Sequence, residues 1–117
     1  MDRNAVISLV EGIAPTRYAA TWDNVGLQVG STAGEARGIL VSVNPSMAAA
    51  SCAIARQYNL IITHHPLLFK PARALATDRE PGRTAAKLLA GDITLYAAHT
   101  NLDATACNRR IADLLGW

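Results

Sequence analysis

The sequence contains little of what marks several common protein classes: few cysteines, little excess charge and no long apolar run. Its two cysteines, Cys52 and Cys107, stand far apart without C-x-x-C spacing, in stretches that read as helical. We therefore expect small, buried thiols, and nothing in the sequence requires a disulfide between them. The formal net charge is only +2, and the eleven basic residues are spread along the chain, which argues against a nucleic-acid-binding face.

Membrane and nucleotide-loop signals are also missing. No apolar run approaches the roughly 20 residues that a membrane span needs, and the first residues do not read as a secretion signal. A soluble, cytoplasmic protein is the expectation. The sequence contains no G-x-x-x-x-G-K-[ST] loop, and the glycines near Gly26 and Gly30 do not match a dinucleotide-binding fingerprint.

What is present is an alternation of helical patterns and β-branched runs across residues 1–117, which predicts a single α/β domain. We expect a mainly parallel or mixed sheet with helices on both faces. Residues 39–43 predict a strand covered on both faces, Ser46 a helix cap and Asn59 the left-handed residue that ends this helix. Tyr58 is expected on the helix's apolar stripe. The predicted strands are 25–29, 39–43, 60–63 and 93–98, and the predicted helices are 2–12, 46–58, 83–90 and 106–115.

All three histidines follow predicted strands, in the segments Leu60–Pro66 and Thr94–Asp103. Parallel strands of α/β domains gather ligands at their carboxyl ends, so His64, His65, His99 and Asp103 are expected to share one site. Adjacent imidazoles at a strand end diverge slightly, which suits two metal ions better than one. A purely structural role of the histidines is the simpler alternative.

Two of these candidate site residues, Asp103 and His99, each have two interpretations. Asp103 supplies an oxygen ligand or, alternatively, caps a helix that begins near residues 104–106. His99 either binds an ion or stands beside it as a proton shuttle. Asp23, in the turn-like Trp22-Asp23-Asn24, is expected to bond its own backbone rather than reach a pocket.

Three segments, Trp22–Gly30, Ile61–Lys70 and Ala97–Asp103, closely resemble one family in the same order. It is the GTP cyclohydrolase I type 2 homologue family, also called NIF-three-like dinuclear metal-centre proteins. The resemblance implies an α/β fold built from two similar halves, and two divalent ions (Zn, Mn, Fe or Co). It also implies that His64 binds one ion, that His65 and Asp103 hold the other, and that His99 is the catalytic acid/base or water-orienting group. Hexameric rings and a nucleotide-like small-molecule substrate are further implications.

Two departures from the family pattern limit these implications. Asn44 stands where the family usually has Asp, which weakens any role of this position in placing a cation or its ligands. Family members are also longer, and a later His-x-x-x-Glu segment supplies further ligands that this sequence does not contain. We therefore expect the amino-terminal half of a dinuclear metal hydrolase-like protein with an incomplete site. A non-enzymatic metal-binding or assembly module is the alternative.

Overall fold

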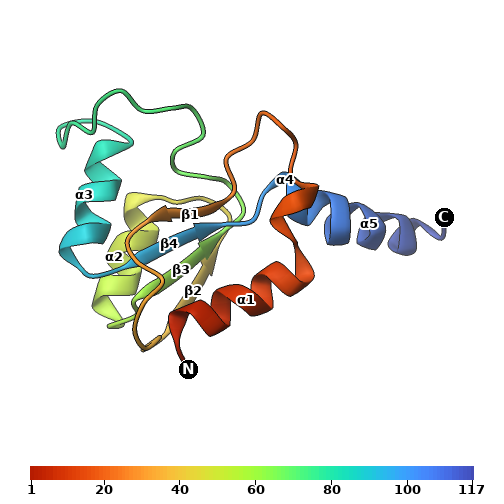
Figure 1. Cartoon of the computed structure of the whole chain (residues 1–117), viewed down its shortest axis with the longest axis horizontal. Helices are drawn as coiled ribbons and strands as arrows, with labels where there is room; N and C mark the ends of the chain where they lie inside the picture. The colour runs from red at the N-terminus through yellow and green to blue at the C-terminus, as the bar shows by residue number, and fades with distance from the viewer.

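The computed structural model describes all residues from 1 to 117, and its centre is one four-stranded sheet in the order β1-β4-β3-β2 (Figure 1). The strands β2, β3 and β4 are parallel, whereas β1 runs antiparallel to β4. The strands are β1 (Gly26–Val29), β2 (Ile39–Ser42), β3 (Leu60–Thr63) and β4 (Thr94–Ala97). The predicted α/β fold with a mainly parallel or mixed sheet is confirmed.

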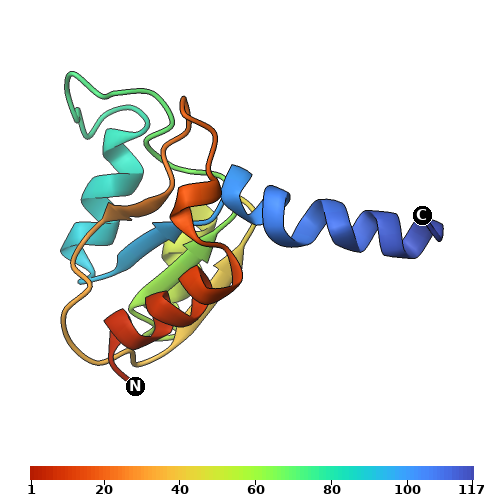
Figure 2. The same cartoon turned by 45° about the vertical axis from the view of Figure 1, so that its right-hand side comes forward.

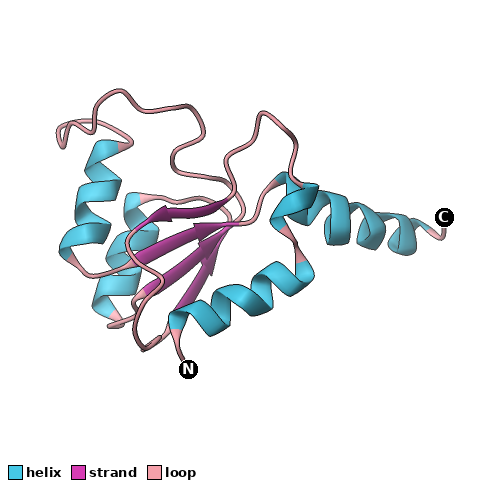
Figure 3. Ribbon diagram, viewed as in Figure 1, coloured by secondary structure: helices cyan, strands magenta, loops and turns pink.

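Helices cover both faces of the sheet (Figures 1 and 3). The helices α2 and α3 pack on one face around an apolar core that includes Ala50, Ile61, Leu88 and Leu95. The helix α1 crosses the opposite face, where the hydroxyl of Tyr96 donates to the carboxylate of Glu11 at 2.8 Å. The helical segments are α1 (Arg3–Ile13), the 3-10 turn η1 (Thr16–Tyr18), α2 (Met47–Ala55), α3 (Gly82–Ala90), α4 (Thr100–Leu102), the π-helical turn η2 (Asp103–Cys107) and α5 (Asn108–Leu115).

Side chains cap the amino-terminal ends of α1 and α2, and the second cap, Ser46, was predicted. The Asp2 side chain accepts a hydrogen bond from the backbone N–H of Asn4, and the Ser46 side chain accepts one from Ala49. Each bond satisfies a donor that the first helical turn leaves free. As predicted, no helix or strand occurs between β3 and α3, which begins at Gly82.

The strand β2 is not covered on both faces, contrary to the prediction. It is the edge of the sheet in this chain, and Val41 is 76% exposed while Leu40, on the other face, packs against the core. The helix α1 lies against the sheet at Tyr96 of β4, two strands away from β2, and leaves Val41 of β2 exposed on the same face. An apolar run alone does not reveal whether a strand is central or at an edge.

The end of α2 also differs from the prediction. The helix ends at Ala55, before Tyr58, and Gln57 rather than Asn59 adopts the left-handed conformation, with a φ of 58°. Asn59 is fully buried instead. Its side chain accepts from the N–H of Arg37 at 2.8 Å and donates to the carbonyl of Glu35 at 2.9 Å, which anchors the loop before β2.

The carboxyl-terminal helical run begins at Thr100, six residues earlier than predicted, and extends away from the sheet (Figure 2). The apolar residues Ile111 and Leu114 of α5 are 55% and 69% exposed. Cys52 and Cys107 are free, as the sequence suggested, but only partly buried. None of the helices combines the length and apolarity needed to cross a bilayer.

Candidate metal centre

The carboxyl ends of β3 and β4 bring the three histidines together. The parallel register pairs Thr63 with Ala97, so His64 and His65 leave one strand at nearly the level where His99 leaves the next. The ring centroids of these three residues lie 5.0 to 5.6 Å apart. Their ligand atoms all lie within 4.8 Å of one another. The predicted convergence of the histidine side chains at one edge of the sheet is confirmed.

The neighbours His64 and His65 reach the same site because regular strand geometry ends at Thr63. The Thr63 hydroxyl donates to the carbonyl of His65 at 2.8 Å and turns the chain there. The two imidazole planes are tilted by 46° relative to each other. A continuing strand would have pointed the two rings to opposite faces of the sheet.

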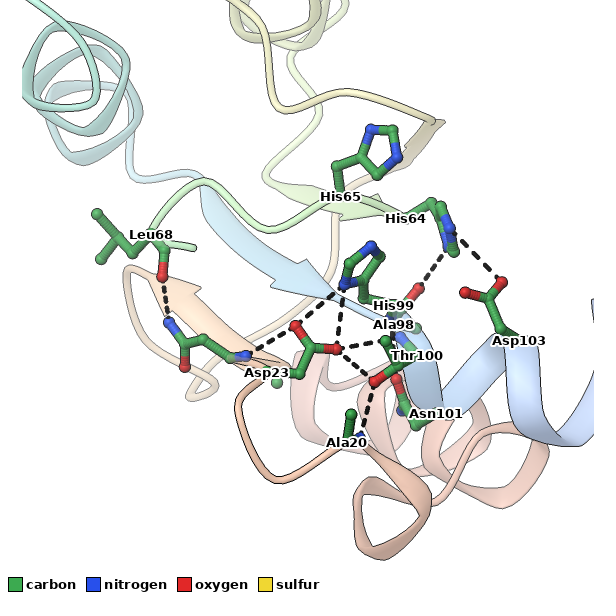
Figure 4. Close-up of polar contacts among 12 residues, drawn as sticks. Ala20, Asp23, His64, His65, Leu68, Ala98, His99, Thr100, Asn101 and Asp103 are labelled. Carbon is green, nitrogen blue, oxygen red and sulfur yellow. Dashed lines mark hydrogen bonds and ion pairs between the residues drawn. The ribbon is translucent and has the colours of Figure 1, made fainter. Parts of the chain in front are cut away.

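Each of the three imidazoles uses its Nδ1 atom in a hydrogen bond to an oxygen, and Figure 4 shows the bonds of His64 and His99. The acceptors are the carbonyl of Ala98 for His64 at 3.0 Å, the side-chain oxygen of Asn44 for His65 at 2.7 Å, and the Asp23 carboxylate for His99. A neutral imidazole that donates through Nδ1 keeps a lone pair on Nε2. All three rings therefore offer Nε2 as a metal-binding atom, the arrangement in which proteins orient histidine ligands.

Asp103 faces His64 rather than capping a helix. It lies inside the helical run, with φ −58° and ψ −46°, so the alternative role as a helix cap is wrong. Its Oδ1 atom lies 3.6 Å from Nε2 of His64, too far for a hydrogen bond. Two donor atoms on one tetrahedral ion with bonds of about 2.0–2.1 Å lie roughly 3.3 Å apart. The spacing of Asp103 and His64 fits two ligands of one small cation.

Asp103 owes its position to the early start of the helix. His99 directly precedes the first helical residue, and Asp103 follows four residues later, where its N–H donates to the carbonyl of His99 at 3.1 Å. One helical turn therefore brings this carboxylate back beside the histidines. Asp103 is also the first residue of the π-helical turn η2, and such turns are frequent at functional sites.

Asp23 is the site residue that the sequence prediction missed. Its side chain is fully buried, and its carboxylate accepts from Nδ1 of His99 at 3.0 and 3.1 Å and from the N–H and hydroxyl of Thr100. Burial raises the pKa of Asp23, but the bonds from Thr100, His99 and Asn24 outweigh burial and hold the pKa below its ordinary value. Its place in one of the three segments of the family resemblance was the available signal.

The residues after His99 complete the support of its ring. The Asn101 side chain accepts from the N–H of His99 at 2.8 Å and donates to the carbonyl of Ala14 at 2.7 Å. The Thr100 hydroxyl also accepts from the N–H of Ala20 at 2.9 Å. Thr100 and Asn101 thus orient the site through hydrogen bonds and also start the helix.

The family model for Duf34/NIF3 (NGG1p interacting factor 3) matches residues 1–117 of this chain. The chain belongs to the Duf34/NIF3 family. Its sequence is 38% identical over 110 residues to the GTP cyclohydrolase 1 type 2 homolog of Listeria monocytogenes, covering 92% of this chain and 30% of that protein. The first curated relatives are longer, and this chain spans between 26% and 45% of their lengths.

Solved structures of Duf34/NIF3 relatives have the same fold. A Staphylococcus aureus protein matches with a TM-score of 0.89 at 36% identity, covering 99% of this chain and 38% of that protein. Reduced HcgD from Methanocaldococcus jannaschii matches with a TM-score of 0.88 at 33% identity, covering 97% of this chain and 46% of that protein. The predicted resemblance to this family is confirmed, with this chain corresponding to a part of each relative.

Proposed function

We propose that this Duf34/NIF3 chain binds divalent metal ions through His64, His65 and Asp103, with His99 completing the centre. The observation that carries the proposal is the convergence of the imidazoles: one ring nitrogen of each lies within 4.8 Å of the others, and each Nδ1 is bonded to an oxygen, which leaves the Nε2 lone pair for a metal ion. Nitrogen donors joined by one carboxylate suit Zn, Mn, Fe or Co. In the two-ion form of the proposal, His64 binds one ion and His65 and Asp103 bind the second, and the Asp103 carboxylate, 3.6 Å from Nε2 of His64, also reaches the first ion.

A metal titration of the chelator-treated, untagged chain tests this proposal. The chain has only three histidines, so every imidazole signal in a nuclear magnetic resonance (NMR) spectrum reports on the site. We expect Zn²⁺ to shift the NMR signals of all three imidazole rings. We also expect two ions to bind per chain. The variants His64→Ala and His65→Ala should each lose binding. No shift of the imidazole signals at saturating Zn²⁺ would refute the proposal.

Asp103 has a matched control in Asp113, an exposed aspartate of α5 whose side chain makes no hydrogen bond or ion pair. Asp103→Asn removes a charged ligand and should weaken metal binding, whereas Asp113→Asn changes the net charge equally and should leave binding unchanged. Equal effects of the two substitutions would mean that Asp103 contributes only its general charge.

For the complete protein we propose a hydrolase-like centre that activates water. Divalent ions held by these residues would supply a water of lowered pKa. In this chain, the Asp23 carboxylate holds the Nδ1–H of His99, so that Nε2 of His99 either binds an ion or accepts a proton. The names of the relatives support a nucleotide-like substrate such as GTP. Because the chain covers less than half of each relative, further ligands from outside residues 1–117 would complete the centre.

An assay with GTP separates this proposal from a non-enzymatic metal-binding module. The chain, alone and combined with the remaining part of a family member, is loaded with each candidate metal, and products are identified by mass spectrometry. Turnover that needs His99 supports the hydrolase. Tight metal binding without turnover in the combined protein supports the module.

We also propose a cytoplasmic homo-oligomer, for which hexameric rings are the form implied by the family resemblance. Exposed apolar side chains on β2 and α5, such as Val41 and Leu114, support assembly because large exposed apolar patches usually mark contact surfaces. Light scattering during size-exclusion chromatography measures the number of copies. A monomer at all concentrations would contradict this part.

A further inference from the structure

Two aromatic rings beside the histidine cluster are exposed to solvent although they contact each other. Trp22 lies in the turn before β1, and Phe69 lies in the loop after β3. Their ring centroids are 5.9 Å apart and their planes meet at 75°. The two residues are 63% and 44% exposed. Exposing apolar ring surface to water costs free energy. Adjacent exposed aromatic rings beside a candidate site therefore suggest a binding surface.

The corner formed by these rings is fixed by hydrogen bonds rather than by the rings alone. The side-chain amide of Asn24 donates to the carbonyl of Leu68, and the N–H of Leu68 donates to the side chain of Gln28 at 3.1 Å. These bonds join the residue before Phe69 to the segment that follows Trp22. The two rings are therefore held in place before any ligand arrives, which lowers the entropy lost on binding.

A cavity of about 320 Å³ opens at this corner. Its walls are Trp22, Phe69, Leu68 and Pro71, and its polar side is formed by Asp23 and Asn24. This volume is at the lower end of the range for small-molecule sites, about 300–1,000 Å³. It suits one ring system rather than a whole nucleotide.

The cavity adjoins the histidines directly. The Phe69 ring stands perpendicular to the His99 ring at a centroid distance of 6.3 Å. Asp23 belongs both to the cavity wall and to the support of His99. A ring bound in the corner would thus lie next to the proposed metal-binding nitrogens.

We propose that the corner of Trp22 and Phe69 binds the planar nitrogen heteroaromatic ring of a small molecule. A flat ring can stack on one wall and meet the other edge to face, the two favoured aromatic geometries. The side-chain oxygen of Asn24 accepts no hydrogen bond within the protein and can accept one from a ring N–H or amino group. This inference rests on the proposed function, because it names the part of the substrate that would lie beside the metal ions. Binding of the ring itself needs no metal ion.

The test observes Trp22 in the metal-free, ¹⁵N-labelled chain. The protein has two tryptophans, so its spectrum contains two indole N–H signals, and Trp117→Phe assigns them. The chain is titrated with guanosine and, as a ligand without an aromatic ring, with ribose. We expect guanosine to shift the Trp22 signal saturably, and ribose to shift neither signal.

Substitutions of Phe69 separate stacking from simple packing. Phe69→Leu keeps an apolar side chain but removes the flat ring, and it should weaken guanosine binding roughly tenfold or more. Phe69→Tyr should bind as the parent does. The control is Leu75→Ala, which removes an exposed apolar side chain of the same loop outside the cavity.

No saturable Trp22 shift with guanosine at millimolar concentration would overturn the inference, and so would unchanged affinity in Phe69→Leu. The two proposals fail separately. Guanosine binding without any Zn²⁺ effect on the histidines would refute the metal proposal and leave the ring site standing. A Zn²⁺ effect on the histidine signals without a Trp22 shift would refute the ring site and leave the metal proposal standing.

Discussion

Asp23 and His99, 76 residues apart in the sequence, are joined by contacts of 3.0 and 3.1 Å between the carboxylate oxygens and Nδ1. A carboxylate accepts but does not donate, so the proton of a neutral His99 ring is held on Nδ1. The lone pair then lies on Nε2, in a ring whose centroid is 5.0 Å from that of His64 and 5.6 Å from that of His65. One buried acid at the turn before β1 thereby sets which nitrogen of His99 can do chemistry.

Asp23→Asn should weaken divalent-metal affinity roughly ten- to a hundredfold, the usual effect of removing a partner that orients a metal-bound histidine. It should also lower the free energy of unfolding by about 1–3 kcal/mol, because Thr100 loses a charged acceptor. Zn²⁺ titration and urea denaturation measure the two effects.

The control for this substitution is Asp78→Asn, which neutralises an exposed aspartate that pairs with Arg79 in the loop between β3 and α3. The ¹⁵N shifts of the His99 ring report its tautomer, which a merely structural role of Asp23 would not change. Unchanged ring shifts in Asp23→Asn would contradict the assigned role even if stability fell.

Asn44→Asp should tighten metal binding, roughly tenfold or less. Asn44 supplies the acceptor for Nδ1 of His65 at 2.7 Å, but its amide is neutral. A carboxylate in the same place forms a stronger, charge-assisted bond and raises the basicity of the ligand. Zn²⁺ competition titration gives the affinity, and Asn108→Asp on exposed α5 adds the same charge elsewhere. Equal gains in both variants would assign the effect to overall charge.

The sequence predicted the meeting of the histidines because it depends only on strand order and on where strands end. The contribution of Asp23 depends on a tertiary contact that no local pattern records, since a turn aspartate usually bonds its own backbone. The same contact explains the error at the carboxyl-terminal helix. Its first N–H, on Thr100, is capped by Asp23 from a distant turn, so no local cap marks the true start.

The error at β2 has a different cause. Residues 39–43 are β-branched and apolar, which predicts burial, yet Val41 is exposed because β2 lies at the edge of the sheet. Sheet order and the placement of α1 decide that exposure, and neither is encoded in a five-residue run.

Metal binding should raise thermal stability if the site is preformed. At free Zn²⁺ about a hundredfold above the dissociation constant, binding adds about 2.7 kcal/mol to the free energy of unfolding. Calorimetry of the metal-free chain with increasing Zn²⁺ should show a rising Tm, and His65→Ala should remove the rise. A Tm independent of Zn²⁺ in the parent chain would favour purely structural histidines.

The last prediction concerns Tyr96 of β4, whose hydroxyl bonds to Glu11 of α1. Burial, and then the hydrogen bond and negative charge of Glu11, raise the pKa of Tyr96 well above its usual value of 10.0. Below pH 10 the tyrosine is protonated in both the folded and unfolded states, and the stabilisation is complete. Above pH 10 the unfolded state releases the proton first, so stability falls as pH rises toward the folded-state pKa.

Tyr96→Phe should therefore cost about 1 kcal/mol at pH 7 through the lost bond to Glu11, and should flatten the decline above pH 10. Tyr58→Phe, at a tyrosine not bonded to Glu11, is the control. Urea denaturation between pH 7 and 11 measures stability, and tyrosinate absorbance shows how many of the three tyrosines titrate while the protein is folded. If all three ionise together near pH 10 in the folded chain, the hydroxyl of Tyr96 is not held between α1 and the sheet.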